Sequence, residues 1–124
     1  ARAALTLSGA DAVMIGRAAL GRPWCVGEIA RSLAGEAAQT PAPARRLEGA
    51  VAHYETLLST YGLRMGVRHA RKHLAAYADD ALGLGAAREE GARLRARIVV
   101  SDDPDEVVAI LRKLYGDVDA SLAA

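Results

Sequence analysis

One short apolar run near the N-terminus places the strongest constraint on the fold. In the stretch DAVMIGRAALGRPW, the segment from Ala12 to Ile15 is an uninterrupted apolar run of the type that parallel, doubly covered strands carry. A strand needs a neighbour to pair its backbone groups, and the only other candidate is the short run from Ile98 to Val100. We therefore expect this chain to be the tail of a larger protein whose other strands lie upstream.

The sequence after residue 22 is typical of a small helical bundle with short connections. Apolar residues at three- and four-residue steps, together with start and stop residues, predict helices over 23–33, 45–61, 65–80, 86–99 and from 103 onward. Asp103, Pro104 and Glu106 predict a capping box at the start of the last helix. The stretch GEAAQTPAPA, residues 35–44, has no apolar period and predicts a linker. We expect one domain over 1–36 and a helical domain over 37–124.

Composition narrows the class of protein. The 124 residues are 52% hydrophobic and 25% charged, which indicates a globular chain. No apolar run approaches the ~20 residues of a membrane span, and the N-terminus lacks the pattern of a signal peptide. A single cysteine suits a reducing compartment, so a cytoplasmic location is expected.

Charge is unevenly distributed along the chain. The net charge is +1, but residues 45–97 carry ten basic residues against six acids, and residues 98–124 carry two against six. An anionic partner is therefore expected at the middle of the chain. Arginine dominates the basic residues, which favours planar contact with phosphate; a GC-rich coding sequence explains that excess equally well.

The middle of the chain contains one strongly basic helix face. At 100° per residue, Arg64, Arg68, Arg71 and Lys72 fall within about 100° of each other, beside an apolar stripe that includes Val67 and Leu74. An ordinary solvated face mixes signs, so we interpret this face as a phosphate-binding surface. A solvated face that happens to be basic is the alternative. The flanking residues His69 and His73 are expected to stack on RNA or to hydrogen-bond with it.

The turn after the apolar run has the features of an anion site. Gly16 permits close approach to the backbone, and the short helix that starts at Arg17 offers free N–H groups to an anion. Barrel enzymes often hold a phosphate in such a turn after their last strands. The alternative is a simple chain reversal with a solvated arginine.

Two motifs carry a resemblance to a known family. The run SGADAVMIGRAALGRPW resembles the last-strand segment of the bacterial-type tRNA-dihydrouridine synthases, and GVRHARKHLAAY, residues 66–77, resembles the G-x-R-x-x-RKH segment of their helical domain. The motifs stand about 50 residues apart, in the family's order. The resemblance implies a mostly α chain: the last strand and helix of a truncated (β/α)8 FMN-binding barrel, followed by a helical tRNA-recognition bundle.

The family's activity implies further expectations. Its members reduce a uridine of tRNA to 5,6-dihydrouridine with FMN and NADPH, and by position Gly16 and Arg17 match the residues that contact the FMN phosphate. The catalytic cysteine and most of the barrel are expected upstream, so the chain alone is expected to be inactive and to hold no FMN. Without strand neighbours, residues 1–22 are expected to self-associate, to refold or to be disordered.

The single cysteine and the three histidines have other expected roles, and two alternative functions stay open. Cys25 follows Pro23 and Trp24 rather than a catalytic-loop motif, so we expect it to be a packing residue. The three histidines lack the companions of a zinc site, and no metal is expected. The remaining alternatives are a free-standing helical nucleic-acid-binding module and the tail of another FMN-dependent barrel dehydrogenase.

Overall fold

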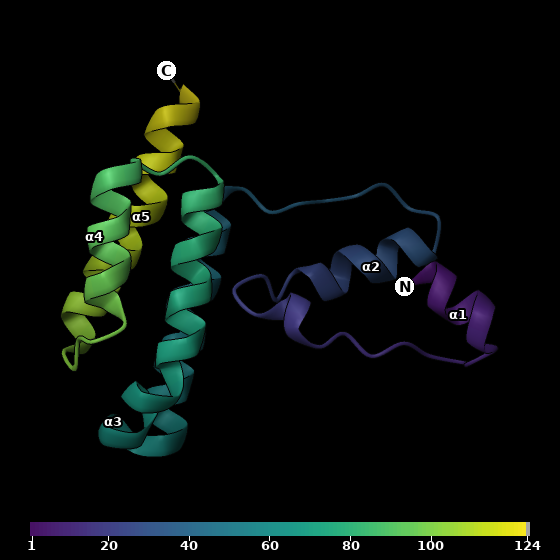
Figure 1. Ribbon diagram of the computed structural model, residues 1–124, viewed down its shortest axis with the longest axis horizontal. Helices are drawn as coiled ribbons and strands as arrows, with labels where there is room; N and C mark the ends of the chain where they lie inside the picture. Colours follow the sequence, from purple (N-terminus) through teal and green to yellow (C-terminus); the bar gives the residue numbers. More distant parts are fainter. Residues whose placement is uncertain (124) are drawn as a thin grey trace.

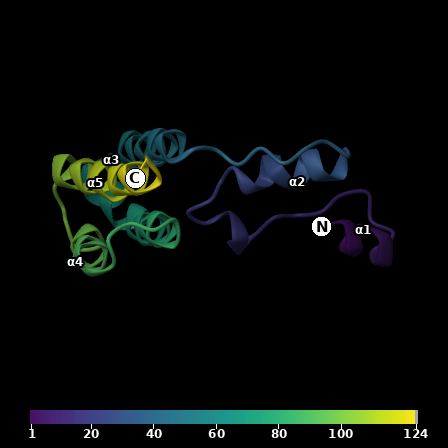
Figure 2. The same ribbon diagram turned by 90° about the horizontal axis from the view of Figure 1, so that it is seen from above.

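The computed structural model describes residues 1–123, with the backbone alone for residues 117 and 119–123. Helices are the only regular elements in that part of the chain, which confirms the mostly α class. In order they are α1 (Arg2–Ser8), the 3₁₀ turn η1 (Arg17–Ala19), α2 (Cys25–Leu33), α3 (Pro43–Gly83), α4 (Arg88–Ile98) and α5 (Pro104–Ala123). Figure 1 and the view from above in Figure 2 show a bundle of α3, α4 and α5, with the segment that carries α1 and α2 extending away from it.

The strand expected over residues 12–15 is absent from the described residues. This segment is irregular, and the backbone groups of residues 11–15 form no hydrogen bond with any described residue. A single extended segment cannot become a strand without a neighbour, because its N–H and C=O groups then have no partners. Met14 projects from the segment with 90% of its surface exposed. The barrel origin of residues 1–36 and the self-association of residues 1–22 therefore stay predictions.

The long helix α3 is a helical hairpin. Its first half ends at Tyr61, and Gly62 adopts φ 74° and ψ 165°, a conformation outside the helix that glycine adopts without strain. The second half then returns along the first (Figure 1). A Cβ at Gly66 would lie 2.8 Å from the carbonyl oxygen of Leu57, so a glycine is required for the two halves to pack this closely. The break predicted at Tyr61-Gly62 is confirmed.

The core lies between the hairpin, α4 and α5. The apolar stripe predicted for the second half of α3 is buried, with Leu74 and Tyr77 each only 2% exposed. The fully buried face of α5 packs against it. The buried core side chains of α4 and α5 are Ile98, Val107, Ile110, Leu111, Leu114, Tyr115 and Val118.

The start of α5 follows the sequence expectation only in part. The Asp103 carboxylate accepts a hydrogen bond from the Asp105 N–H at 3.0 Å, as an N-cap does. The second half of the predicted capping box is wrong. The Glu106 carboxylate instead forms a two-pronged ion pair with Arg97, at 2.6 and 2.8 Å, and accepts a hydrogen bond from the Ser101 hydroxyl. A guanidinium is a stronger partner for a carboxylate than a backbone N–H, so the contact with α4 takes precedence.

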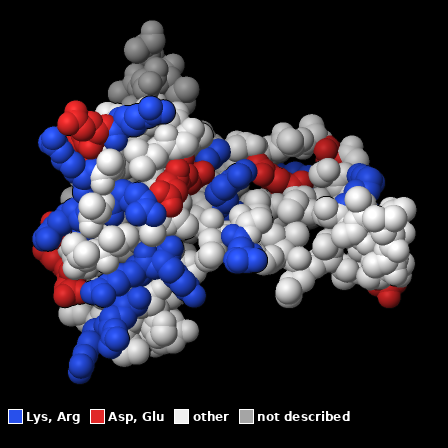
Figure 3. All heavy atoms as spheres, viewed as in Figure 1, with Lys and Arg blue, Asp and Glu red and all other residues white. Residues whose placement is uncertain are grey.

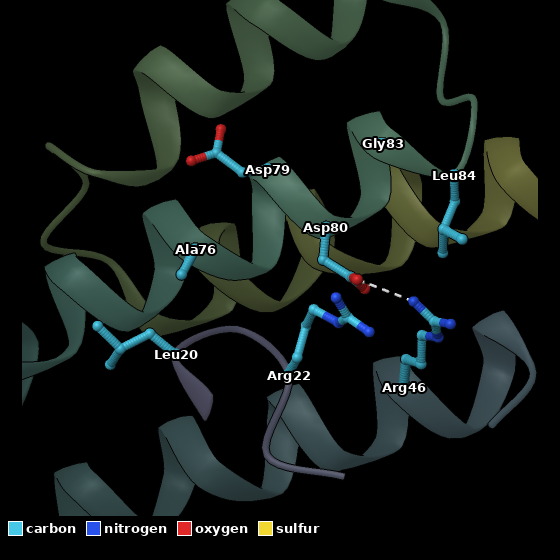
Figure 4. Close-up of a pocket in the computed structure, with 8 residues that line it drawn as sticks. All are labelled: Leu20, Arg22, Arg46, Ala76, Asp79, Asp80, Gly83 and Leu84. Carbon is cyan, nitrogen blue, oxygen red and sulfur yellow. Dashed lines mark hydrogen bonds and ion pairs between the residues drawn. The ribbon is translucent and has the colours of Figure 1, made fainter. Parts of the chain in front are cut away.

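A buried ion pair joins the two halves of the hairpin. Arg46 Nη1 lies 2.8 Å from Asp80 Oδ1, and both side chains are more than 90% buried. Figure 4 shows the pair beside a pocket of about 600 Å³. Arg46 Nε donates to the Pro41 carbonyl at 2.9 Å, and the Tyr115 hydroxyl donates to the Asp80 carboxylate at 3.0 Å. Burial, followed by the Asp80 charge, raises the pKa of Tyr115 well above its usual range, so Tyr115 remains a donor.

Removing one member of this pair should destabilise the bundle strongly. Arg46→Ala leaves Asp80 buried without its counter-charge, and we expect a loss of about 3–5 kcal/mol in the free energy of unfolding. Arg45→Ala is the matched control, because Arg45 is exposed and its ion-pair partner among the described side chains is Glu48 on the same helix; its effect should stay within about 0.5 kcal/mol. Urea unfolding of both variants measures the difference, and equal effects would contradict the role of the pair.

Candidate nucleic-acid interface

A groove lined by three arginines among its six residues lies beside the reversal of α3. It is formed by Leu63, Arg64, Val67, Arg68 and Arg71 from the second half of α3 and by Asp102 from the α4–α5 connection, and its volume is about 560 Å³. We call it the basic groove. Figure 3 shows Lys and Arg side chains gathered over the lower end of the bundle, where α3 reverses direction in Figure 1.

Helical periodicity determines which side chains of the second half of α3 face solvent. Val67, Ala70 and Leu74 are at most 4% exposed, and this stripe orients the helix against the rest of the bundle. Arg64, Arg68 and Lys72 are therefore exposed, and the position of the cationic face beside the apolar stripe is as the sequence predicts.

The structure adds an acid that the helix alone did not reveal. Asp102 Oδ1 accepts a hydrogen bond from Arg71 Nη2 at 3.1 Å, and both side chains are largely exposed. Among the side chains that the structure describes, no carboxylate pairs with Arg64, Arg68 or Lys72. The unneutralised positive charge therefore lies at Arg64, Arg68 and Lys72, and Arg71 is already paired.

The two histidines predicted to contact RNA lie in different environments. His69 is exposed, and its ring centroid lies 4.5 Å from that of Tyr61 across the reversal. His73 is half-buried and packs edge-on against His53, with the ring centroids 4.6 Å apart. His53 Nδ1 in turn lies 3.0 Å from the Tyr77 hydroxyl. His69 is thus available to a ligand at the surface, whereas His73 belongs to an internal polar cluster.

Burial changes the pKa values of the side chains in that cluster. Desolvation lowers the pKa of His53, and desolvation together with the neighbouring His53 and Lys72 lowers the pKa of His73. Burial and the Asp80 charge raise the pKa of Tyr77 to about 12. Both imidazoles are therefore favoured in the neutral form near pH 7.

The predicted phosphate turn lies in the N-terminal part of the chain, away from the basic groove in sequence. Gly16 and Arg17 are both exposed, and a Cβ placed on Gly16 would meet no atom within 4 Å. The Gly16 carbonyl accepts the hydrogen bond from Ala19 that closes η1. The two sets of predicted site residues thus belong to two different elements, η1 and α3.

The structure also bears on Cys25 and on metal binding. Cys25 is 8% exposed, and its thiol lies 3.6 Å from the Ala18 carbonyl oxygen, as suits a packing residue. Within the part of the chain that the structure describes, no group of three or more His, Cys, Asp or Glu side chains is arranged to hold a metal ion.

Comparison with known proteins identifies the family. Residues 1–113 match the family model of dihydrouridine synthases. The chain belongs to the dihydrouridine synthase family. That match includes both the turn at Gly16 and the basic groove.

Named relatives agree with the family assignment. The chain is 38% identical to a probable tRNA-dihydrouridine synthase of Rhodobacter capsulatus over 98% of its own length and 35% of the relative's. It is 43% identical to the tRNA-dihydrouridine synthase B of Xanthomonas axonopodis pv. citri over 87% of its length and 31% of the relative's. It is 41% identical to a probable tRNA-dihydrouridine synthase of Rhizobium leguminosarum bv. phaseoli over 94% of its length and 32% of the relative's.

Two further findings complete the comparison. The chain spans about a third of the length of these dihydrouridine synthases, and no solved structure matches it. None of the helices in the described residues is long and apolar enough to cross a bilayer.

The internal histidine cluster predicts a pH dependence of stability. Because the folded-state pKa values of His53 and His73 lie below the ordinary value of 6.5, the unfolded chain binds protons more tightly. The stability that neutral His53 and His73 give the folded state is complete above about pH 6.5. It is lost as the pH falls through their lowered folded-state pKa values. Urea midpoints measured from pH 7.5 to 5 should fall, and His73→Gln should flatten the profile. His69→Gln changes an exposed histidine and should keep the pH dependence of the original protein. If His73→Gln also keeps it, this account is contradicted.

Proposed function

We propose that this chain supplies the tRNA-binding surface and the cofactor-phosphate turn of a tRNA-dihydrouridine synthase, an enzyme that reduces a uridine of tRNA to 5,6-dihydrouridine. The basic groove is the observation that carries the proposal, since it is built on residues that lie inside the family match. The names of the relatives support tRNA as the substrate.

Arg64 and Arg68 in the basic groove and Lys72 on the same half of α3 are the proposed phosphate contacts. Each is exposed, and each lies on a helix that is held against the core by the neighbouring apolar stripe. Arg71 first has to exchange Asp102 for a phosphate, and an exposed pair of this kind is worth only about 0–1 kcal/mol. Phosphate contacts determine affinity and register rather than base choice, so these residues are not proposed to select the uridine.

The N-terminal turn is proposed to hold the phosphate of FMN. Gly16 has open space where a side chain would be, and the N–H groups of Arg17 and Ala18 form no hydrogen bond with another described residue. Those features fit an incoming phosphate oxygen, which takes backbone N–H donors at such a turn. The flavin, when bound, supplies hydride transfer, with NADPH as the proposed reductant.

The groove can be tested by the salt dependence of tRNA binding in the full-length enzyme. Three phosphate contacts correspond to a slope of log K against log salt of about −2 to −2.7, taking roughly 0.7–0.9 per contact. The double variant Arg64→Ala, Arg68→Ala should reduce the magnitude of the slope by about 1.4–1.8 and weaken binding of several tRNAs alike.

A matched double variant controls for net charge. Arg93 and Arg112 are exposed residues of α4 and α5 that do not line the groove, and replacing both by alanine removes the same two charges. We expect this control to keep most of the slope. If the two double variants have the same slope, or if the groove variant binds tRNA normally while circular dichroism shows it folded, the proposed surface is wrong.

The phosphate turn can be tested by crowding it. Gly16→Val introduces a β-branched side chain where the phosphate is proposed to approach the backbone, and losing one N–H contact should weaken FMN binding about tenfold. Gly27→Val is the control, because Gly27 also has nothing within 4 Å of an added Cβ but lies on α2. Fluorescence titration of the full-length apoenzyme with FMN measures both, and equal affinities would contradict the assignment.

A further inference from the structure

An exposed aromatic pair lies at the reversal of α3, beside the basic groove. Tyr61 is the last residue before the break at Gly62, and His69 lies on the returning half. The two rings are 4.5 Å apart between centroids and tilted by 41°. The break thus brings together two rings that are eight positions apart in sequence.

The position of Tyr61 is unlike that of the other tyrosines in this chain. Tyr54, Tyr77 and Tyr115 are 2%, 2% and 0% exposed and belong to the core, whereas Tyr61 is 52% exposed. Two apolar side chains beside it, Leu63 and Met65, are also 59% and 44% exposed. Packing within the chain therefore accounts for three of the tyrosines and leaves much of the Tyr61 ring open to solvent.

The surroundings of the pair indicate what it would bind. Arg64 and Arg68 line the groove that begins at Leu63, and they lie on the same half of α3 as His69. Proteins bind unpaired bases by combining cations, which hold the nucleic-acid backbone, with exposed aromatic rings. Every base has a face on which such a ring can stack. A duplex offers no free base face along its length, so this pair suits a single-stranded loop of RNA.

We propose that Tyr61 and His69 form a stacking site for one unpaired base of the tRNA whose backbone occupies the basic groove. This inference rests on the proposed function and extends it from phosphate contact to base contact. Stacking tolerates any base, so the site favours looped-out RNA over duplex without reading the sequence.

The test compares two RNA probes with the full-length enzyme: an unmodified tRNA transcript and a blunt RNA duplex with the same number of phosphates. Tyr61→Leu keeps an apolar side chain but removes the ring, and it should weaken tRNA binding about 5- to 100-fold, the loss associated with one stacked base. Binding of the duplex and the salt slope should be unchanged. Tyr61→Phe keeps the ring and should remain within about twofold of the original protein for both probes.

The outcomes separate this proposal from the proposed function. If Arg64→Ala, Arg68→Ala reduces the salt slope while Tyr61→Leu binds tRNA normally, the stacking site is overturned and the phosphate surface stands. An equal loss on tRNA and duplex in Tyr61→Leu also overturns it, since the ring then acts on the fold or on the backbone. If Tyr61→Leu loses helical content, His69→Leu is used instead, because it removes the exposed partner ring. Its binding of tRNA and of the duplex is then compared in the same way. An unchanged slope in the double arginine variant refutes the phosphate surface itself.

Discussion

The buried pair of Arg46 and Asp80 is the interaction on which the rest of the bundle depends. Its two members come from opposite halves of the α3 hairpin, 34 positions apart. Arg46 also hydrogen-bonds the Pro41 carbonyl of the linker, and Asp80 accepts from Tyr115 of α5. Burying two charges is costly unless their remaining hydrogen-bonding groups are satisfied, and here that requires the hairpin, the linker and α5 to adopt one arrangement together. The pair therefore specifies how these elements are placed.

The same pair connects the bundle to the N-terminal part of the chain. The Arg46 guanidinium lies 4.8 Å from the centroid of the Trp24 ring, a cation–π contact with the residue before α2. Nearby, a Cβ at Gly21 would lie 2.5 Å from the backbone of Ala76, so the chain that follows η1 passes directly against α3. The segment that carries the proposed phosphate turn is thus joined to the bundle through the contacts of Trp24 with Arg46 and of Gly21 with Ala76. A change at Arg46 is expected to disturb both.

Most helices could be predicted from the sequence, because local rules govern them. The apolar steps of α3, the break at Gly62 and the acid-proline start of α5 depend on residues within one or two turns of each other. The expected strand at Ala12–Ile15 did not appear, since a strand depends on neighbours that the described residues do not contain. Glu106 also departed from its local role, because the Arg97 guanidinium on α4 competes for it.

For the candidate site, the sequence by itself determined the family, the chemical character of the basic face and its position beside the buried stripe of α3. These follow from motif order and from 100° per residue. Only the tertiary structure decided that Arg71 is paired with Asp102, 31 positions away, that His73 packs against His53, and that His69 meets Tyr61. Each of these contacts joins residues whose separation along the chain says nothing about their distance. They arise when the core holds helices and their connections side by side, and helical periodicity alone contains no information about which segment is the neighbour.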